Sequence, residues 1–119
     1  EGGTIRLGPA RVSARWLREL IELDIDALYR AVSSPMLLIA GGKDLQCTPE
    51  SAEHLARLVG PSTQFHIVPD MIHHLSVHDG PPKLFDMRDT DALPLAPQLL
   101  VLLEDWFARE NGRKNVTPG

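Results

Sequence analysis

Runs of apolar residues divide the middle of the chain into a strand, a helix and a second strand. The continuous apolar run at 35–40, which ends at Gly41-Gly42, is typical of a strand buried on both faces. An amphipathic helix is predicted at 49–59, with Gly60 as its stop, and another strand at 63–68. Strand, helix and strand in about 35 residues make a βαβ unit, so we expect two parallel strands joined by a right-handed crossover.

Three further helices are predicted on either side of this unit. Apolar side chains recur every three or four residues in 13–23 and 24–32 and, over a wider face, in 97–110. The Leu-rich face of the last of these segments is expected to be core. Asn111-Gly112 should end that helix and leave 113–119 as a flexible tail.

Two remaining segments carry shorter patterns. Residues 4–7 alternate like a short strand or hairpin arm, which Gly8-Pro9 interrupts. A loop rich in His, Asp, Gly and Pro runs from Asp70 to about residue 96, with a helical turn predicted near 82–87. Together the elements predict one α/β domain over 1–112.

Composition excludes several classes of binding partner and indicates the cellular compartment. The chain has 12 Lys and Arg against 16 Asp and Glu, a formal net charge of −4, and no basic stripe, so neither nucleic acid nor an anionic membrane surface is expected as a partner. No apolar run approaches the roughly 18 residues of a membrane span, and residues 1–10 lack the apolar core of a signal peptide. Cys47 is the single cysteine, which excludes an internal disulfide and a zinc cluster of thiolates. We therefore expect a cytoplasmic protein.

Chemistry-bearing side chains follow both strands of the predicted βαβ unit. Asp44 comes just after the first strand, and His73 lies in the loop that leaves the second. The carboxyl ends of parallel strands meet at one edge of a sheet, so these two side chains can meet although they are far apart in sequence. A carboxylate bonded to one imidazole nitrogen holds the ring in the tautomer that makes the other nitrogen a general base. The spacing therefore predicts Asp44 as an acid partner and His73 as a base.

The residues at this edge resemble the α/β-hydrolase family. The segment from Pro35 to Asp44 resembles its penultimate core strand and acid turn, and Val68 to His73, followed by a terminal helix with Trp106, resembles its last strand, histidine loop and final helix. The family order is Ser, then Asp or Glu, then His, and the second and third members stand here in that order. Shorter matches are similar to a bacterial esterase/lipase-like or serine-aminopeptidase-like branch, at 14–16, 18–19, 43–46 and 73–82.

This resemblance implies the C-terminal half of an α/β-hydrolase fold that supplies Asp44 and His73 to a Ser-His-Asp triad. None of the six serines stands in the G-x-S-x-G pattern of the family's nucleophile, and the oxyanion-hole loop is missing too. The nucleophile is expected in a missing N-terminal half, so the isolated chain should be inactive. The complete enzyme would act on esters, thioesters or amides of small acyl substrates. An Asp nucleophile, as in dehalogenases and epoxide hydrolases, and acyltransferase chemistry remain open.

The residues near this edge also allow other interpretations. His74 is the next candidate base. A metal cluster of His73, His74, His78 and Asp79 is disfavoured because a loop does not present two histidines as one face of a helix does. Cys47 is expected to be a small buried hydrophobe, and neither a metal nor a cofactor is expected. The alternative to a hydrolase half is a non-enzymatic half-fold that self-associates or binds a partner chain.

Overall fold

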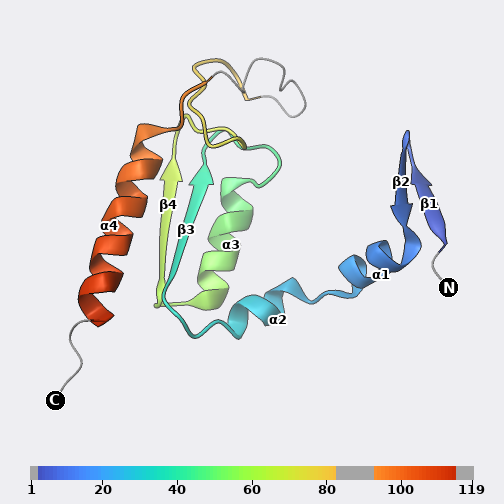
Figure 1. Ribbon diagram of the computed structural model, residues 1–119, viewed down its shortest axis with the longest axis horizontal. Helices are drawn as coiled ribbons and strands as arrows, with labels where there is room; N and C mark the ends of the chain where they lie inside the picture. The colour runs from blue at the N-terminus through green and yellow to red at the C-terminus, as the bar shows by residue number, and fades with distance from the viewer. Residues whose placement is uncertain (1–2, 83–92, 115–119) are drawn as a thin grey trace.

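The centre of the molecule is a pair of parallel strands joined by a helix (Figure 1). In the computed structural model, which describes residues 3–82 and 93–114, strand β3 (Met36–Gly41) pairs with β4 (Thr63–Val68) from Met36↔Thr63 to Gly41↔Val68. Helix α3 (Pro49–Val59) connects them and contacts both strands. The predicted βαβ unit is confirmed, and its first strand is shifted by one residue, from 35–40 to 36–41.

The predicted ends of α3 are confirmed. The Thr48 hydroxyl accepts a hydrogen bond from the Ser51 N–H at 3.4 Å, and Pro49 occupies the first turn, where the backbone N–H groups lack partners within the helix. Gly60 follows the last turn with φ +80°, a conformation that glycine adopts without strain. These local signals explain why the helix begins and ends at the residues predicted.

Helix α4 (Pro97–Lys114) packs with the βαβ unit, and the strand pair lies between α3 and α4 in Figure 1. Residues 36–82 and 93–114 together are here called the packed region. The core cluster consists of Val68, Met71, Ala96 and Leu99, and half-buried hydrophobic residues pack against it, among them Ile39, Val77, Leu102 and Leu103. The Leu-rich face was expected to be core throughout. That expectation is wrong in part, because Leu100 and Phe107 are exposed.

The predicted stop of α4 is also wrong, because the helix continues through Asn111-Gly112 to Lys114. One glycine inside an exposed helix costs only about 1 kcal/mol relative to alanine. An ion pair between Arg113 and Glu110, with a 2.8 Å N···O distance, spans the same turn. Residues 115–119 of the predicted tail and residues 83–87 of the predicted helical turn lie outside the described residues.

Residues 4–30 form the second part of the molecule, here called the N-terminal arm. Strands β1 (Thr4–Leu7) and β2 (Ala10–Ser13) make an antiparallel hairpin, of which only the first strand was predicted. Helices α1 (Ala14–Glu22) and α2 (Ile25–Arg30) follow, and each is shorter than predicted at both ends, where the flanking residues act as caps. Ser13 accepts a hydrogen bond from the Trp16 N–H at 3.3 Å, and Asp24 accepts one from the Ala27 N–H at 2.9 Å.

Within the arm, α2 contacts α3, whereas α1 and the hairpin extend away from the packed region (Figure 1). No residue of its hairpin or helices is buried, and large apolar side chains along it are exposed, including Ile5, Leu7, Trp16, Leu20, Ile21 and Leu28. The radius of gyration is 18.2 Å, whereas a compact chain of this length has one of about 13.5 Å. The arm therefore has an amphipathic pattern without a core of its own.

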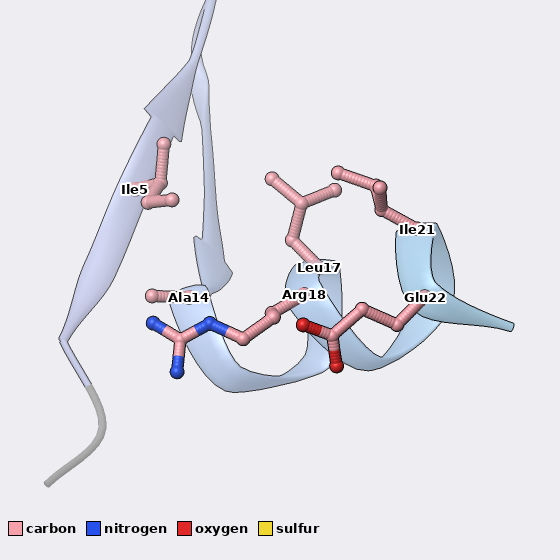
Figure 2. Close-up of a pocket in the computed structure, with 6 residues that line it drawn as sticks. All are labelled: Ile5, Ala14, Leu17, Arg18, Ile21 and Glu22. Atoms are coloured by element: carbon pink, nitrogen blue, oxygen red, sulfur yellow. The ribbon is translucent and has the colours of Figure 1, made fainter.

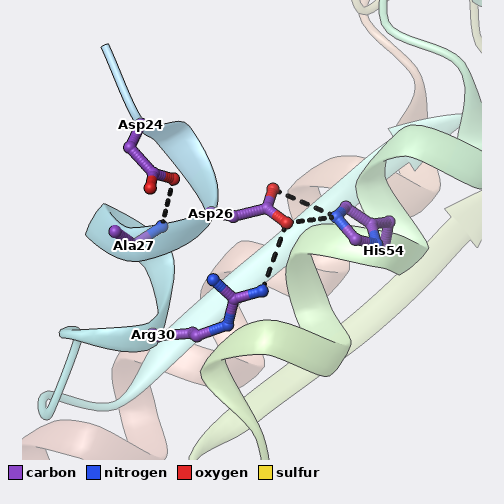
Figure 3. Close-up of polar contacts among 5 residues, drawn as sticks. All are labelled: Asp24, Asp26, Ala27, Arg30 and His54. Carbon is purple, nitrogen blue, oxygen red and sulfur yellow. Dashed lines mark hydrogen bonds and ion pairs between the residues drawn. The ribbon is translucent and has the colours of Figure 1, made fainter.

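A small polar cluster links the arm to the packed region (Figure 3). The Asp26 carboxylate on α2 contacts His54 Nε2 on α3 at 3.1 and 3.2 Å, and it also pairs with Arg30 at 3.3 Å. The three side chains are 40 to 57% exposed, so water screens these interactions.

Over residues 3–82 and 93–114, no helix is long and apolar enough to cross a bilayer.

Candidate acid and base site

Asp44 lies in a tight turn directly after β3. The Gly42 N–H donates to the Val68 carbonyl at 2.8 Å and the Lys43 N–H to the Met71 carbonyl at 3.0 Å, so the turn runs against the loop that leaves β4. A Cβ at Gly41 would collide with the Met71 carbonyl, and one at Gly42 would collide with the Pro69 carbonyl. The two glycines are therefore needed because two backbone segments approach each other closely here.

His73 lies near the tip of a hairpin-like loop at 69–79. The Met71↔Val77 bridge closes this loop, with hydrogen bonds from the Ile72 N–H to the Ser76 carbonyl and from the His78 N–H to the Asp70 carbonyl, both 3.0 Å long. Leu75 turns the chain back with φ +63°, a conformation that is rare for a residue with a side chain. Buried Met71 and Ile72 anchor the base of the loop, which leaves His73 half-buried beside them.

Lys43 holds this loop against the Asp44 turn. Its ammonium pairs with the Asp70 carboxylate at 2.9 Å and donates to the His78 carbonyl at 2.6 Å. One side chain thus contacts the loop on both sides of His73. Because Lys43 precedes Asp44 in the chain, the turn that carries the carboxylate also fixes the segment that carries the imidazole.

The Asp44 carboxylate and the His73 imidazole are hydrogen bonded. His73 Nδ1 lies 3.0 Å from Oδ2 and 3.2 Å from Oδ1 of Asp44. The Asp44 side chain is 10% exposed and that of His73 is 38% exposed. The carboxylate is therefore sheltered while the imidazole stays accessible, which is the asymmetry that an orienting acid and a working base require.

The charge of Asp44 is stabilised by local donors. Burial raises the pKa of this carboxyl, but hydrogen bonds from the Cys47 N–H, from His73 and from the Gln46 N–H, together with the attraction of His73, outweigh it and lower the pKa below its usual value. The Gln46 and Cys47 N–H groups both lie 2.8 Å from Oδ1. Asp44 is thus an ionised partner for the imidazole near neutral pH.

No family model, no curated protein and no solved structure matches this chain. The geometry of the site is therefore the basis for proposing a function. The meeting of Asp44 and His73 was expected from the strand edge, and the structure brings them together. Their catalytic roles stay predictions.

One neighbour of the pair, Cys47, differs from the sequence-based expectation. Cys47 is exposed, not buried, and its backbone N–H donates to Asp44 Oδ1 at 2.8 Å. His74 is half-buried, and its ring centroid is 6.1 Å from that of His73. Within residues 3–82 and 93–114, the metal-binding donors that gather belong to Asp44, Cys47 and His73, and not to the disfavoured set of His73, His74, His78 and Asp79.

The bridging role of Lys43 was missed at the sequence level. Its signal was available, because Lys43 and Asp70 carry opposite charges and each follows a strand at the same sheet edge.

A separate hollow lies on the N-terminal arm, between β1 and α1 (Figure 2). It has a volume of about 240 Å³ and is lined by Ile5, Ala14, Leu17, Arg18, Ile21 and Glu22. In Figure 1 the arm stands apart from the loops at the carboxyl ends of β3 and β4. The hollow is thus no part of the Asp44–His73 site.

Proposed function

We propose that this chain supplies the acid and the base of a hydrolase of the Ser-His-Asp type. The hydrogen bond between the sheltered Asp44 carboxylate and the accessible His73 imidazole carries the proposal. Its position at the carboxyl ends of two parallel strands adds support, because open α/β sheets place their reactive groups there. The half-fold of an α/β-hydrolase is the architecture that this arrangement fits best.

In this proposal the nucleophile comes from another polypeptide segment, because no serine of the chain stands in a G-x-S-x-G turn. His73 Nε2 accepts the proton of that serine hydroxyl as its oxygen attacks an ester, thioester or amide carbonyl. The imidazolium then donates the proton to the leaving group, and a water repeats the two steps to release the acid. Asp44 stays ionised and stabilises the imidazolium throughout.

The test uses the natural polypeptide or complex that contains these residues. It should react with a serine-directed fluorophosphonate and hydrolyse a p-nitrophenyl ester. Each of the changes His73→Ala and Asp44→Asn should lower kcat by about 10⁴-fold. His54→Ala, a change of an exposed histidine on α3, is the matched control and should leave kcat unchanged. Full activity in His73→Ala would refute the assignment. The isolated chain should show no hydrolysis that depends on His73.

A second candidate is a non-enzymatic half-fold that associates with itself or with another chain. The exposed area favours it, because the chain exposes 8825 Å² whereas a compact monomer of its mass exposes about 6,400 Å². The uncovered apolar residues of the arm account for part of this difference. Sedimentation equilibrium of the isolated chain tests the idea, and a stable monomer at all concentrations would count against both candidates.

A further inference from the structure

A group of three different metal-binding donors lies beside the Asp44–His73 hydrogen bond. One carboxylate oxygen of Asp44, the Sγ of Cys47 and one ring nitrogen of His73 all lie within 4.8 Å of one another. The acid–base reaction proposed above makes no use of Cys47. We propose that these side chains bind a zinc ion, with water in the fourth position.

The donor set favours zinc over the other common divalent ions. Zn²⁺ takes thiolate, imidazole and carboxylate ligands together, whereas Mg²⁺ and Ca²⁺ require oxygen ligands alone. Three protein ligands with one open position is an arrangement that zinc adopts in many proteins. A single thiolate is sufficient here, although the chain has too few cysteines for a cluster of thiolates.

Only a small movement is needed to bring the three donors onto one ion. Zinc bonds of about 2.0 to 2.3 Å at tetrahedral angles place neighbouring donors about 3.4 to 3.6 Å apart. The Nδ1 of His73 and the Oδ2 of Asp44 are already 3.0 Å apart. Cys47 then needs to approach by about 1 Å, which rotation of an exposed side chain can supply.

The backbone around the ligands is already held in place. The Cys47 N–H is fixed to Asp44 Oδ1 at 2.8 Å, so the thiol and the carboxylate belong to one rigid turn. Lys43 holds the loop of His73 against that turn through Asp70 and His78. The segments that carry the ligands are therefore already ordered in the metal-free chain, so metal binding costs little further conformational entropy.

Zinc binding and acid–base use of His73 exclude each other. A metal on Nδ1 replaces the hydrogen bond to Asp44, and a metal on Nε2 occupies the atom that would accept the proton. The ion is thus an inhibitor of the proposed hydrolase, and reduction of Cys47 is a condition for inhibition because only the thiolate binds zinc well. This regulatory consequence rests on the proposed function, whereas the metal site itself does not.

Cobalt(II) is the probe for the site, because it replaces zinc and reports its ligands by absorption. Co²⁺ added to the reduced, metal-free chain should bind in a 1:1 ratio, with the intense visible bands of four-coordinate cobalt and a thiolate-to-cobalt charge-transfer band in the near ultraviolet. Zn²⁺ should displace it. Cys47→Ser should abolish the charge-transfer band and weaken Zn²⁺ binding at least about tenfold, and His73→Gln should weaken binding by a similar factor.

His54→Gln is the matched control, because His54 is a half-exposed histidine that also contacts a carboxylate. It should leave both the spectrum and the Zn²⁺ affinity unchanged, and circular dichroism should show that each variant keeps its fold. A missing charge-transfer band in the wild-type chain, or a band and affinity that persist in His73→Gln, would overturn the proposal.

A further experiment tests the metal site and the proposed hydrolase function separately. Hydrolysis by the natural complex should be inhibited by Zn²⁺ and restored by a chelator, with weaker inhibition in Cys47→Ser. Metal binding without any hydrolysis would contradict the proposed hydrolase function and support the metal site. Hydrolysis dependent on His73, without cobalt or zinc binding, would support the hydrolase function and contradict the metal site.

Discussion

The packed region and the N-terminal arm use similar helical patterns with different results. Residues 36–82 and 93–114 contain all the described hydrophobic residues that are buried, such as Val68, Met71 and Leu99. The arm contains amphipathic helices with good caps, yet Ile21 on α1 is 75% exposed. An amphipathic pattern thus specifies that a face should be covered, and the covering surface must come from elsewhere.

The two regions therefore differ in what stabilises them. The packed region is stabilised by burial and by backbone approaches that tolerate no added atom, as at Gly41 and Gly42. The arm is stabilised by local terms, namely hairpin pairing, caps at Ser13 and Asp24 and the exposed Arg15–Glu19 ion pair. Local terms of this kind contribute about 1 kcal/mol each, so changes to the two regions should differ in their effect on stability.

The largest effect is expected from Gly42→Ala. The new methyl group would meet backbone atoms of Pro69, which cannot move aside as a side chain can, so the free energy of unfolding should fall by at least about 3 kcal/mol. Gly112→Ala is the control, because that position has open space and should gain about 1 kcal/mol as a better helix former. Urea unfolding followed by circular dichroism measures both. Equal stability of the two variants would show that the turn and the loop do not meet as described.

The comparison of Met71→Ala with Ile21→Ala sharpens the contrast between the regions. Met71 is 1% exposed and belongs to the core cluster, so its truncation should lower the free energy of unfolding by about 2 to 5 kcal/mol. Ile21 in the arm should change it by no more than about 0.5 kcal/mol in the isolated chain. Similar losses at the two positions would mean that the arm is covered in solution.

Asp44→Asn should have an intermediate effect, a loss of about 1 to 3 kcal/mol, because the carboxylate accepts from His73 and from two backbone N–H groups. The pKa of Asp44 is lowered in the folded state, so its charge stabilises the fold above the usual carboxyl pKa, and this stabilisation is lost as the pH falls. Unfolding free energies measured from neutral to acidic pH should therefore converge for wild type and variant at low pH. Asp79→Asn, at an exposed position of the same loop, is the control, and a constant gap at every pH would contradict the prediction.

The smallest effect is expected where the two regions join. His54→Ala removes the contact between α3 and Asp26 on α2 (Figure 3). Because both side chains are about half exposed, the free energy of unfolding should fall by at most about 1 kcal/mol. Hydrogen exchange should increase in α2 while that of β3 and β4 stays unchanged. Faster exchange throughout the strands would show that the junction stabilises the packed region as well.

The predictions from sequence succeeded where a local signal coincided with a packed environment. Thr48, Pro49 and Gly60 mark the ends of α3, and the apolar runs mark both strands, because burial there agrees with local preference. The end of α4 could not be predicted, since the cost of Gly112 is small against the ion pair and helical turns beside it. The strand at Ala10–Ser13 was missed because it is short and exposed on nearly every residue.

The site was predictable in its two main residues and not in its surroundings. Asp44 and His73 could be paired because parallel strands bring their loops to one edge. The exposure of Cys47 depends on which way a short turn rotates, and the double contact of Lys43 depends on the path of the loop after β4. Neither path is specified by periodicity or composition.

The contact between Asp44 and His73 depends on the register in which β3 pairs with β4. A slip of one residue from the pairing of Gly41 with Val68 would shift the two loops by about 3.3 Å and turn every side chain of β4 to the opposite face. The 3.0 Å contact between His73 and Asp44 would then be lost. The nuclear magnetic resonance signal of the His73 Nδ1 proton therefore distinguishes correctly aligned molecules from misaligned ones within a population that has the same secondary structure.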